Sequence, residues 1–241
     1  MIPLQDTIPS RQFPLANWTI IGITTVAFLF ELSLPEHRLE TLVQLFGLIP
    51  ARYTDPSWAE WMGYPKSYLP FLTNMFLHSG WGHFIGNMWT LYIFGDNVED
   101  RMGTGRYLVF YILTGIVAGL THTLLYPTST VPAIGASGAI SGVMAAYMFL
   151  FPRSRIVFFL PILFLPYFLE IPALVYIGAW FIGQLISGVT VLAITDQASG
   201  IAFWAHIGGF IAGAMSYRVF VRHCYRCEYS DEYYHRYYNY A

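Results

Sequence analysis

The chain has 241 residues, of which 56% are hydrophobic and only 11% are charged. A soluble domain usually carries about 25% charged residues, so this composition excludes an ordinary soluble globular protein. The formal net charge of −2 argues against nucleic acid as a partner.

Long runs without Asp, Glu, Lys or Arg predict helices that span a membrane. These runs are residues 12–30, 67–95, 107–152, 171–195 and 197–217. A span needs roughly 20 apolar residues, so only the run 107–152 is long enough for two helices. The prolines and small polar residues of 126–132 predict the turn between them. We therefore expect an all-α protein with six spans.

Three segments follow from this pattern. Residues 1–17 are polar and contain prolines, which predicts a cytoplasmic N-terminal segment and no cleavable signal peptide. Residues 18–221 form the expected six-helix membrane domain. Residues 222–241 are rich in Tyr and charge, which predicts a cytoplasmic and poorly ordered tail. Zinc binding by His223, Cys224 and Cys227 is an unfavoured reading of this tail, because the spacing is loose.

The basic residues predict the orientation of the spans, because cytoplasmic loops carry an excess of Lys and Arg. Nine of the 12 Lys and Arg residues lie in segments that six spans place on the same side of the membrane as the two termini. These are Arg11, Arg101, Arg106, Arg153, Arg155, Arg218, Arg222, Arg226 and Arg236. The other three lie in one long loop, residues 35–77. Both termini are therefore expected in the cytoplasm. The long outer loop carries Trp58, Trp61, Tyr64 and Tyr68, so it lies either partly in the membrane interface or as an ordinary extracellular loop.

Polar residues gather at the start of the second, fourth and sixth expected spans. These three clusters are residues 78–87, 135–142 and 205–213. Each of the three spans enters the membrane from the outer side, so the clusters lie at a similar depth, roughly 7 Å below the surface after five residues of helix. Because polar groups inside a membrane are costly, we expect Ser137, His206, His83 and Asn87 to converge on one functional site.

Glycines predict how the helices approach one another. Gly138 and Gly142 are four residues apart, as are Gly209 and Gly213, and such spacing lets helix backbones pack closely. His206 lies on the same face as Gly209 and Gly213. If these faces meet, the imidazole of His206 comes within hydrogen-bonding reach of the Ser137 hydroxyl.

This pair of side chains predicts acyl-transfer chemistry. A serine hydroxyl becomes a good nucleophile when an adjacent neutral histidine takes its proton. We find no carboxylate near the clusters that could orient His206, so we expect a dyad. The amino terminus of a helix at Ser137, together with His83 and Asn87, could stabilise the negative charge on a substrate carbonyl oxygen.

The motifs resemble those of the rhomboid family of intramembrane serine proteases. Gly135-x-Ser137-Gly138 resembles the nucleophile motif, and His206-x-x-Gly209-x-x-x-Gly213 resembles the base-bearing helix. His78, His83 and Asn87 match the H-x4-H-x3-N pattern, and Glu99-x-Arg101-x-Gly103 resembles a cytoplasmic motif. Leu69-Pro70 stands where the family often has Trp-Arg.

The resemblance implies a rhomboid six-helix bundle that cleaves other membrane proteins in or near their transmembrane segments. It implies that Ser137 is the nucleophile, His206 the general base, and His83, Asn87 and the Ser137 backbone N–H the oxyanion donors. No metal or cofactor is implied. The expected partners are transmembrane protein substrates and the lipid bilayer, and we expect an integral multi-pass protein of a prokaryotic cell (inner) membrane.

Other readings of these residues remain open. Ser137 alone could be a small packing residue, and the chain could be a catalytically silent relative that binds transmembrane helices. The polar cluster could also line a transporter or channel, although the inner halves of the second, fourth and sixth spans are mostly apolar. Glu99 and Arg101 are expected to form a structural network, His78 to be a structural hydrogen-bonding residue, and Glu31 to reach the lipid headgroups.

Overall fold

The structure is a computed structural model and describes residues 1–162, 165–194 and 201–222. Its helices are α1 (Leu15–Ser33), α2 (Glu36–Phe46), α3 (Ala51–Thr54), α4 (Pro56–Trp61), α5 (Pro70–Thr73), the 3-10 helix η1 (Asn74–Phe76), α6 (Trp81–Met102), α7 (Thr104–Leu125), α8 (Ser137–Leu150), α9 (Ala173–Ile194) and α10 (Phe203–Phe220). Its strands are β1 (Ile2–Asp6), β2 (Arg155–Ile162) and β3 (Leu165–Pro172). The tail residues 223–241 lie outside this description, so the predictions for them stay predictions.

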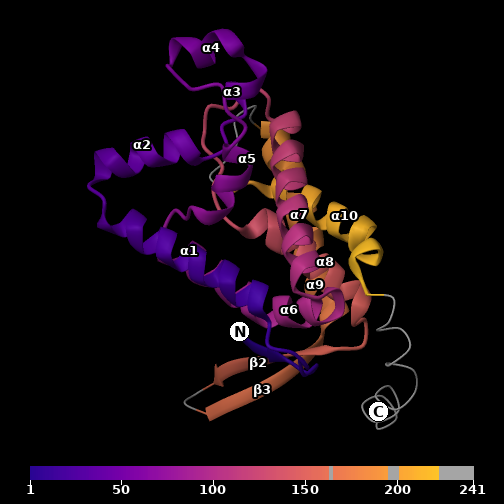
Figure 1. The fold of residues 1–241 in the computed structure, drawn as a ribbon. Coiled ribbons are helices and arrows are strands. Elements are labelled where there is room, and N and C mark those ends of the chain that lie inside the picture. Colours follow the sequence, from indigo (N-terminus) through magenta and orange to yellow (C-terminus); the bar gives the residue numbers. More distant parts are fainter. Residues whose placement is uncertain (163–164, 195–200, 223–241) are drawn as a thin grey trace.

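Six long helices occupy the positions expected for the six spans. They are α1, α6, α7, α8, α9 and α10, and Figure 1 shows most of them gathered into one bundle, with α1 inclined beside it. Within the described residues, α1, α7 and α9 are long and apolar enough to cross a membrane, and α8 is a shorter apolar helix. The mostly helical architecture is therefore confirmed.

Helix α8 forms the centre of the bundle. Every residue from Gly138 to Met148 is buried, and α8 packs against α6, α7 and α10. Its amino-terminal half contains only small side chains and one isoleucine, which allows neighbouring backbones to come close. The residue that begins this central helix is Ser137.

The glycine faces of α8 and α10 meet as the sequence predicts. A Cβ atom added at Gly209 would overlap the carbonyl oxygen of Gly138, and one added at Gly213 would overlap the carbonyl oxygen of Gly142. Neither position therefore has room for a side chain. The two backbones are in direct contact at two positions about one turn apart. This contact fixes the distance between residues that project beside it.

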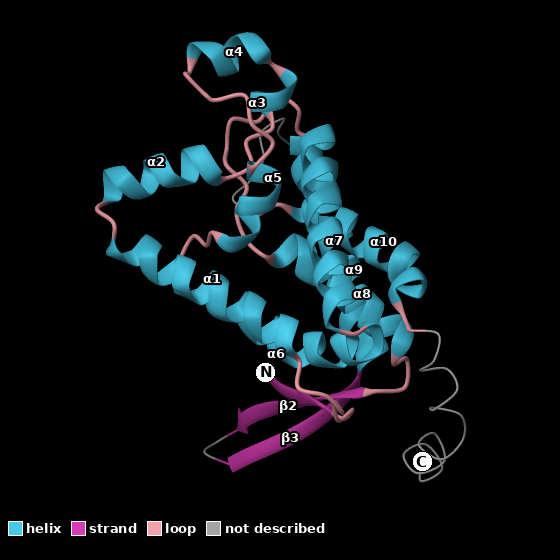
Figure 2. Cartoon of the chain, viewed as in Figure 1, coloured by secondary structure: helices cyan, strands magenta, loops and turns pink. Residues whose placement is uncertain are grey.

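A three-stranded antiparallel sheet, in the order β1-β2-β3, shows that the all-α expectation is incomplete. The register pairs Ile2 with Phe159 and Phe158 with Leu169. Ile156 and Phe158 are buried while their neighbours are more exposed, which is the period-two pattern of a strand. Figure 2 shows the sheet beside the end of the bundle where the amino terminus lies.

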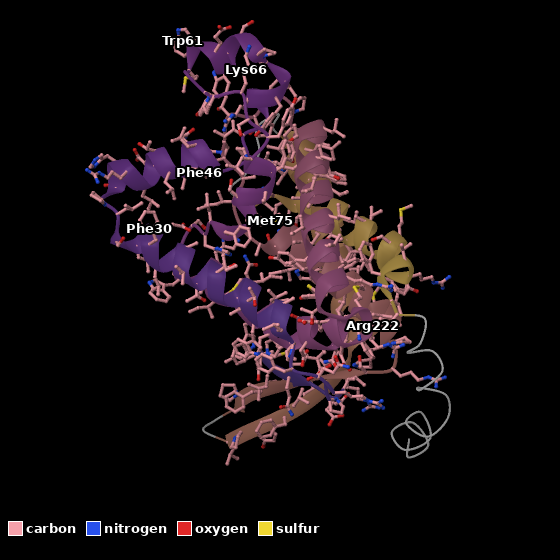
Figure 3. All side chains as sticks on the ribbon, in the orientation of Figure 1. Phe30, Phe46, Trp61, Lys66, Met75 and Arg222 are labelled. Atoms are coloured by element: carbon pink, nitrogen blue, oxygen red, sulfur yellow. The ribbon has the colours of Figure 1, made fainter. Side chains whose placement is uncertain are left out.

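Arg52 makes two side-chain hydrogen bonds within the long loop between α1 and α6. Its guanidinium donates from Nη1 to the Leu45 carbonyl (3.0 Å) and from Nη2 to the Pro65 carbonyl (2.7 Å). The loop also joins the segment before α8 through a bridge between Leu48 and Ala133. Figure 1 shows α4 beyond α3 at the end of the molecule away from the sheet, and Figure 3 places Trp61 at this end.

The opposite end of the bundle is held by Glu99. Its carboxylate accepts hydrogen bonds from the backbone N–H groups of Ala16 (3.0 Å) and Asn17 (2.8 Å), which caps the start of α1. The backbone N–H of Arg222 donates to the Arg101 carbonyl at 3.2 Å, and Figure 3 shows Arg222 at this end. The structural role expected for Glu99 is confirmed, and the start of α1 lies at the same end as the last residues of α10.

Candidate active site

The segment before Ser137 can be built only around a glycine. Gly135 has φ +123°, a conformation that L side chains rarely adopt. A Cβ atom at this position would also lie 2.6 Å from Cε1 and Nε2 of His83. The absence of a side chain at position 135 therefore lets this segment lie against His83, directly before Ser137 begins α8.

The side chains of Ser137 and His206 are in contact. His206 lies in the first two turns of α10, and its Nε2 is 2.7 Å from the Ser137 Oγ. This distance is that of a hydrogen bond in which a serine hydroxyl donates to a neutral imidazole. The geometric prediction from the glycine spacing is therefore confirmed.

The other ring nitrogen of His206 meets a residue that the sequence analysis missed. Its Nδ1 is 2.7 Å from Oε1 of Gln184 on α9. Trp180, one turn earlier on α9, places its ring centroid 5.9 Å from that of His206. A search limited to carboxylates could not find this contact, but Gln184 is the only amide side chain in the apolar sequence of α9, and a polar residue in such a setting is a signal.

Helix α6 contributes His83 and Asn87 to the opposite side of the site. Nδ1 of His83 is 3.1 Å from the Ser79 Oγ, and Nδ2 of Asn87 donates to Nε2 of His78 at 2.9 Å. His78 is only 4% exposed and lies behind Asn87, in the structural role expected for it.

Glu31 differs from its expected role. It is 2% exposed, and its carboxylate accepts a hydrogen bond from the backbone N–H of His78 at 3.1 Å. The expectation that Glu31 reaches the lipid headgroups is therefore wrong. The residue fixes the segment that leads into α6, and so acts on the position of Asn87 only indirectly.

All four predicted site residues line one cavity of about 450 Å³. Its walls are formed by Ser79, His83, Gly86, Asn87, Thr90, Ile134, Ser137, Ile140, Met144, Tyr176, Trp180, Ile201, Ala202 and His206. A serine hydroxyl in contact with an imidazole and two side chains that can donate hydrogen bonds thus face a shared space, between α6 on one side and α9 and α10 on the other. The lining combines these few polar groups with apolar side chains, as is usual for small sites that bind and orient a substrate.

Comparison with known proteins identifies the fold. Residues 65–223 match the family model described as the Rhomboid domain. The chain belongs to the rhomboid family. The match covers more than half of the sequence and includes all four predicted site residues, as well as the segment 99–103.

Several rhomboid relatives have similar sequences. "RHOMBOID-like protein 12, mitochondrial" of Arabidopsis thaliana is 29% identical over 163 residues, which cover 61% of this chain and 44% of that protein. "Rhomboid protein 1, mitochondrial" of Saccharomyces cerevisiae is 26% identical over 238 residues, which cover 84% of this chain and 63% of that protein. "Rhomboid protease GluP" of Bacillus subtilis is 34% identical over 87 residues, which cover 36% of this chain and 17% of that protein. The chain thus spans less than two thirds of the length of each.

The rhomboid family assignment and the long apolar helices make this an integral membrane protein. The names of the relatives do not support the expected prokaryotic cell membrane, because those reported above from Arabidopsis and yeast are mitochondrial, while GluP is bacterial. The family assignment alone does not specify a reaction, so the chemistry must be argued from the site.

Proposed function

We propose that this rhomboid is an intramembrane serine endopeptidase. It hydrolyses peptide bonds in or near transmembrane segments of other membrane proteins through a dyad of Ser137 and His206. The observation that carries the proposal is the 2.7 Å contact between the Ser137 Oγ and Nε2 of His206 inside a cavity. Relatives whose names include the word protease give it independent support.

In the first half of the reaction, the Ser137 Oγ attacks the scissile carbonyl carbon while His206 Nε2 takes the hydroxyl proton. The carbonyl oxygen becomes an oxyanion, which the N–H groups at the start of α8 and the side chains of His83 and Asn87 stabilise. The C–N bond then breaks, and the imidazolium returns its proton to the leaving amine. An acyl ester on Ser137 remains.

In the second half, a water molecule attacks this ester and gives a proton to His206. The C–Oγ bond breaks, the carboxylic acid leaves, and the proton returns to the Ser137 oxygen. Both halves thus use one base in one position, which agrees with a single direct contact between Nε2 and the hydroxyl.

The six long helices are proposed to span the bilayer, with both termini in the cytoplasm. Helix α8 has 14 residues, which give a length of about 21 Å against a hydrocarbon core of about 30 Å. If its carboxyl end reaches the inner surface, Ser137 lies about 9 Å below the outer one. The site is then submerged but close to the water on the outer side, from which the hydrolytic water comes.

Labelling with a fluorophosphonate probe tests this function without a known substrate. The purified protein in detergent should be labelled, and both Ser137→Ala and His206→Ala should lose labelling while they keep the thermal unfolding midpoint. Cleavage of a model transmembrane substrate in liposomes should follow the same pattern. An unlabelled wild-type protein, or equal labelling of Ser137→Ala, would instead favour the silent helix-binding relative.

A further inference from the structure

Nδ1 of His206 contacts the side chain of Gln184 on α9, whereas the nucleophile Ser137 begins α8. Nδ1 is 2.7 Å from Oε1 of Gln184, and Nε2 is 2.7 Å from the Ser137 Oγ. We infer that Gln184 is a positioning residue that keeps His206 in the tautomer competent to act as a base. This inference rests on the proposed function of the same site.

The argument depends on which atoms can donate. A neutral imidazole carries one N–H, and the oxygen of a glutamine amide can only accept. With Oε1 facing Nδ1, the ring hydrogen must therefore be on Nδ1, and Nε2 keeps the lone pair that receives the Ser137 proton. If the amide were reversed, its NH2 group would donate to Nδ1, and the ring hydrogen on Nε2 would point at the serine oxygen. The orientation in the structure is the productive one.

Contacts on both sides of Gln184 hold α9 against α10. One turn after Gln184, the Nε1 of Trp204 donates to the Gly188 carbonyl at 3.2 Å. A Cβ atom added at Gly188 would lie 3.3 Å from Ile207 Cδ1 and 3.4 Å from Phe203 Cβ, so α9 packs there against side chains of α10. One turn before Gln184, Trp180 lies against the His206 ring. Gln184 thus lies between two contacts that join α9 to α10, the helix that carries His206.

An amide suits this place better than the carboxylate of a soluble serine protease triad. A carboxylate within a membrane span has a large desolvation cost, whereas a neutral amide offers an acceptor oxygen at a much smaller cost. Gln184 would then provide the orienting function of the third triad member without adding a negative charge beside the base.

The test compares two substitutions of similar size at position 184. Gln184→Met removes the acceptor, and Gln184→Glu keeps one. Ile186→Met on the same helix is the control, because Ile186 is 63% exposed. In Gln184→Met, the maximal rate constant of fluorophosphonate labelling should fall about tenfold at an unchanged half-saturating probe concentration, because the base is misoriented and the cavity is intact. Gln184→Glu should restore most of the rate, and Ile186→Met should match the wild type.

A spectroscopic readout separates orientation from general damage. In protein labelled with 15N-histidine, with His206→Ala for assignment, the wild-type His206 should carry its hydrogen on Nδ1, and Gln184→Met should show a mixture of tautomers. An unchanged tautomer with an unchanged labelling rate in Gln184→Met would overturn the inference, as would a Gln184→Glu variant as slow as Gln184→Met. Failure of the wild-type protein to label would refute the proposed function itself, which is a different outcome.

Discussion

The backbone contact between α8 and α10 predicts a large effect from the addition of one methyl group. In Gly209→Ala, the new Cβ would lie 2.0 Å from the carbonyl oxygen of Gly138, whereas real Cβ atoms essentially never come closer than 3.0 Å to such an atom. Because backbone atoms cannot give way as a flexible side chain does, the two helices must separate by about 1 Å. The distance from the Ser137 Oγ to His206 Nε2 then grows from 2.7 Å to about 3.7 Å, beyond hydrogen-bonding range.

A displacement of this size in a reacting pair costs about 100-fold in rate, and overpacking of the contact costs about 1–3 kcal/mol of stability. The measurements are the rate of fluorophosphonate labelling and the thermal unfolding midpoint in detergent. Gly178→Ala is the matched control, because nothing lies within 4 Å of a Cβ at that position of α9. A Gly209→Ala protein that labels at the wild-type rate would show that this backbone contact does not set the geometry of the dyad.

Two further predictions concern other parts of the chain. Burial raises the pKa of Asp6 from 3.8 to about 7, so the folded protein holds a proton that the unfolded chain releases above pH 4. The contribution of Asp6 to stability should therefore be lost as the pH rises from 4 to 7. Asp6→Asn, which keeps an acceptor for Tyr147, should reduce the slope of stability against pH and stabilise the protein at pH 8 by at most about 4 kcal/mol in denaturation experiments. Gly135→Ala combines a strained φ with a clash against His83, so it should lower stability by about 1–3 kcal/mol and abolish labelling.

Each of these two predictions can be contradicted by a specific result. Equal slopes of stability against pH in the wild type and in Asp6→Asn would contradict the raised pKa of the half-buried Asp6, whose carboxylate accepts hydrogen bonds from Tyr147 and Asn97. For position 135, Gly82→Ala is the comparison, since a Cβ there meets nothing within 4 Å. Equal labelling of Gly135→Ala and Gly82→Ala would mean that the segment before Ser137 adapts to a side chain.

Much of the arrangement could be predicted because the membrane restricts the possibilities. Uncharged runs predicted the positions of the six long helices, and the expected common side of entry predicted that Ser137, His206 and His83 converge, as they do on one cavity. The spacing of Gly209 and Gly213 then predicted the contact between two helices far apart in the sequence. These inferences rest on backbone hydrogen bonding and helix periodicity, which act locally and can be read from composition and spacing.

Most of the missed features depend on contacts with backbone groups of other segments. Strands β2 and β3 lie between the fourth and fifth expected spans, in a segment for which the sequence analysis predicted no helix or strand. Glu31 lies near an expected helix end, which suggested exposure, but its partner is the backbone of His78, 47 residues away. Arg52 anchors the outer loop through carbonyl groups, which leave no trace in the sequence.

His206 contacts Ser137 on α8 and Gln184 on α9, and these two helices are packed to different degrees. We therefore expect the distance to Ser137 and the orientation of the imidazole ring to respond to different substitutions. The distance to Ser137 is set by the backbone contact of α8 with α10, which lies in the buried centre. The orientation of the ring is set by Gln184 on α9, where only Ala173, Ile177 and Gly188 are buried among the residues of the helix. A change that loosens α9 should therefore slow labelling while the dyad distance stays short. A change that separates α8 from α10 should lengthen the dyad distance and leave the contact with Gln184 in place. In Gly209→Ala, His206 should therefore keep its hydrogen on Nδ1, whereas Gln184→Met should show a mixture of tautomers.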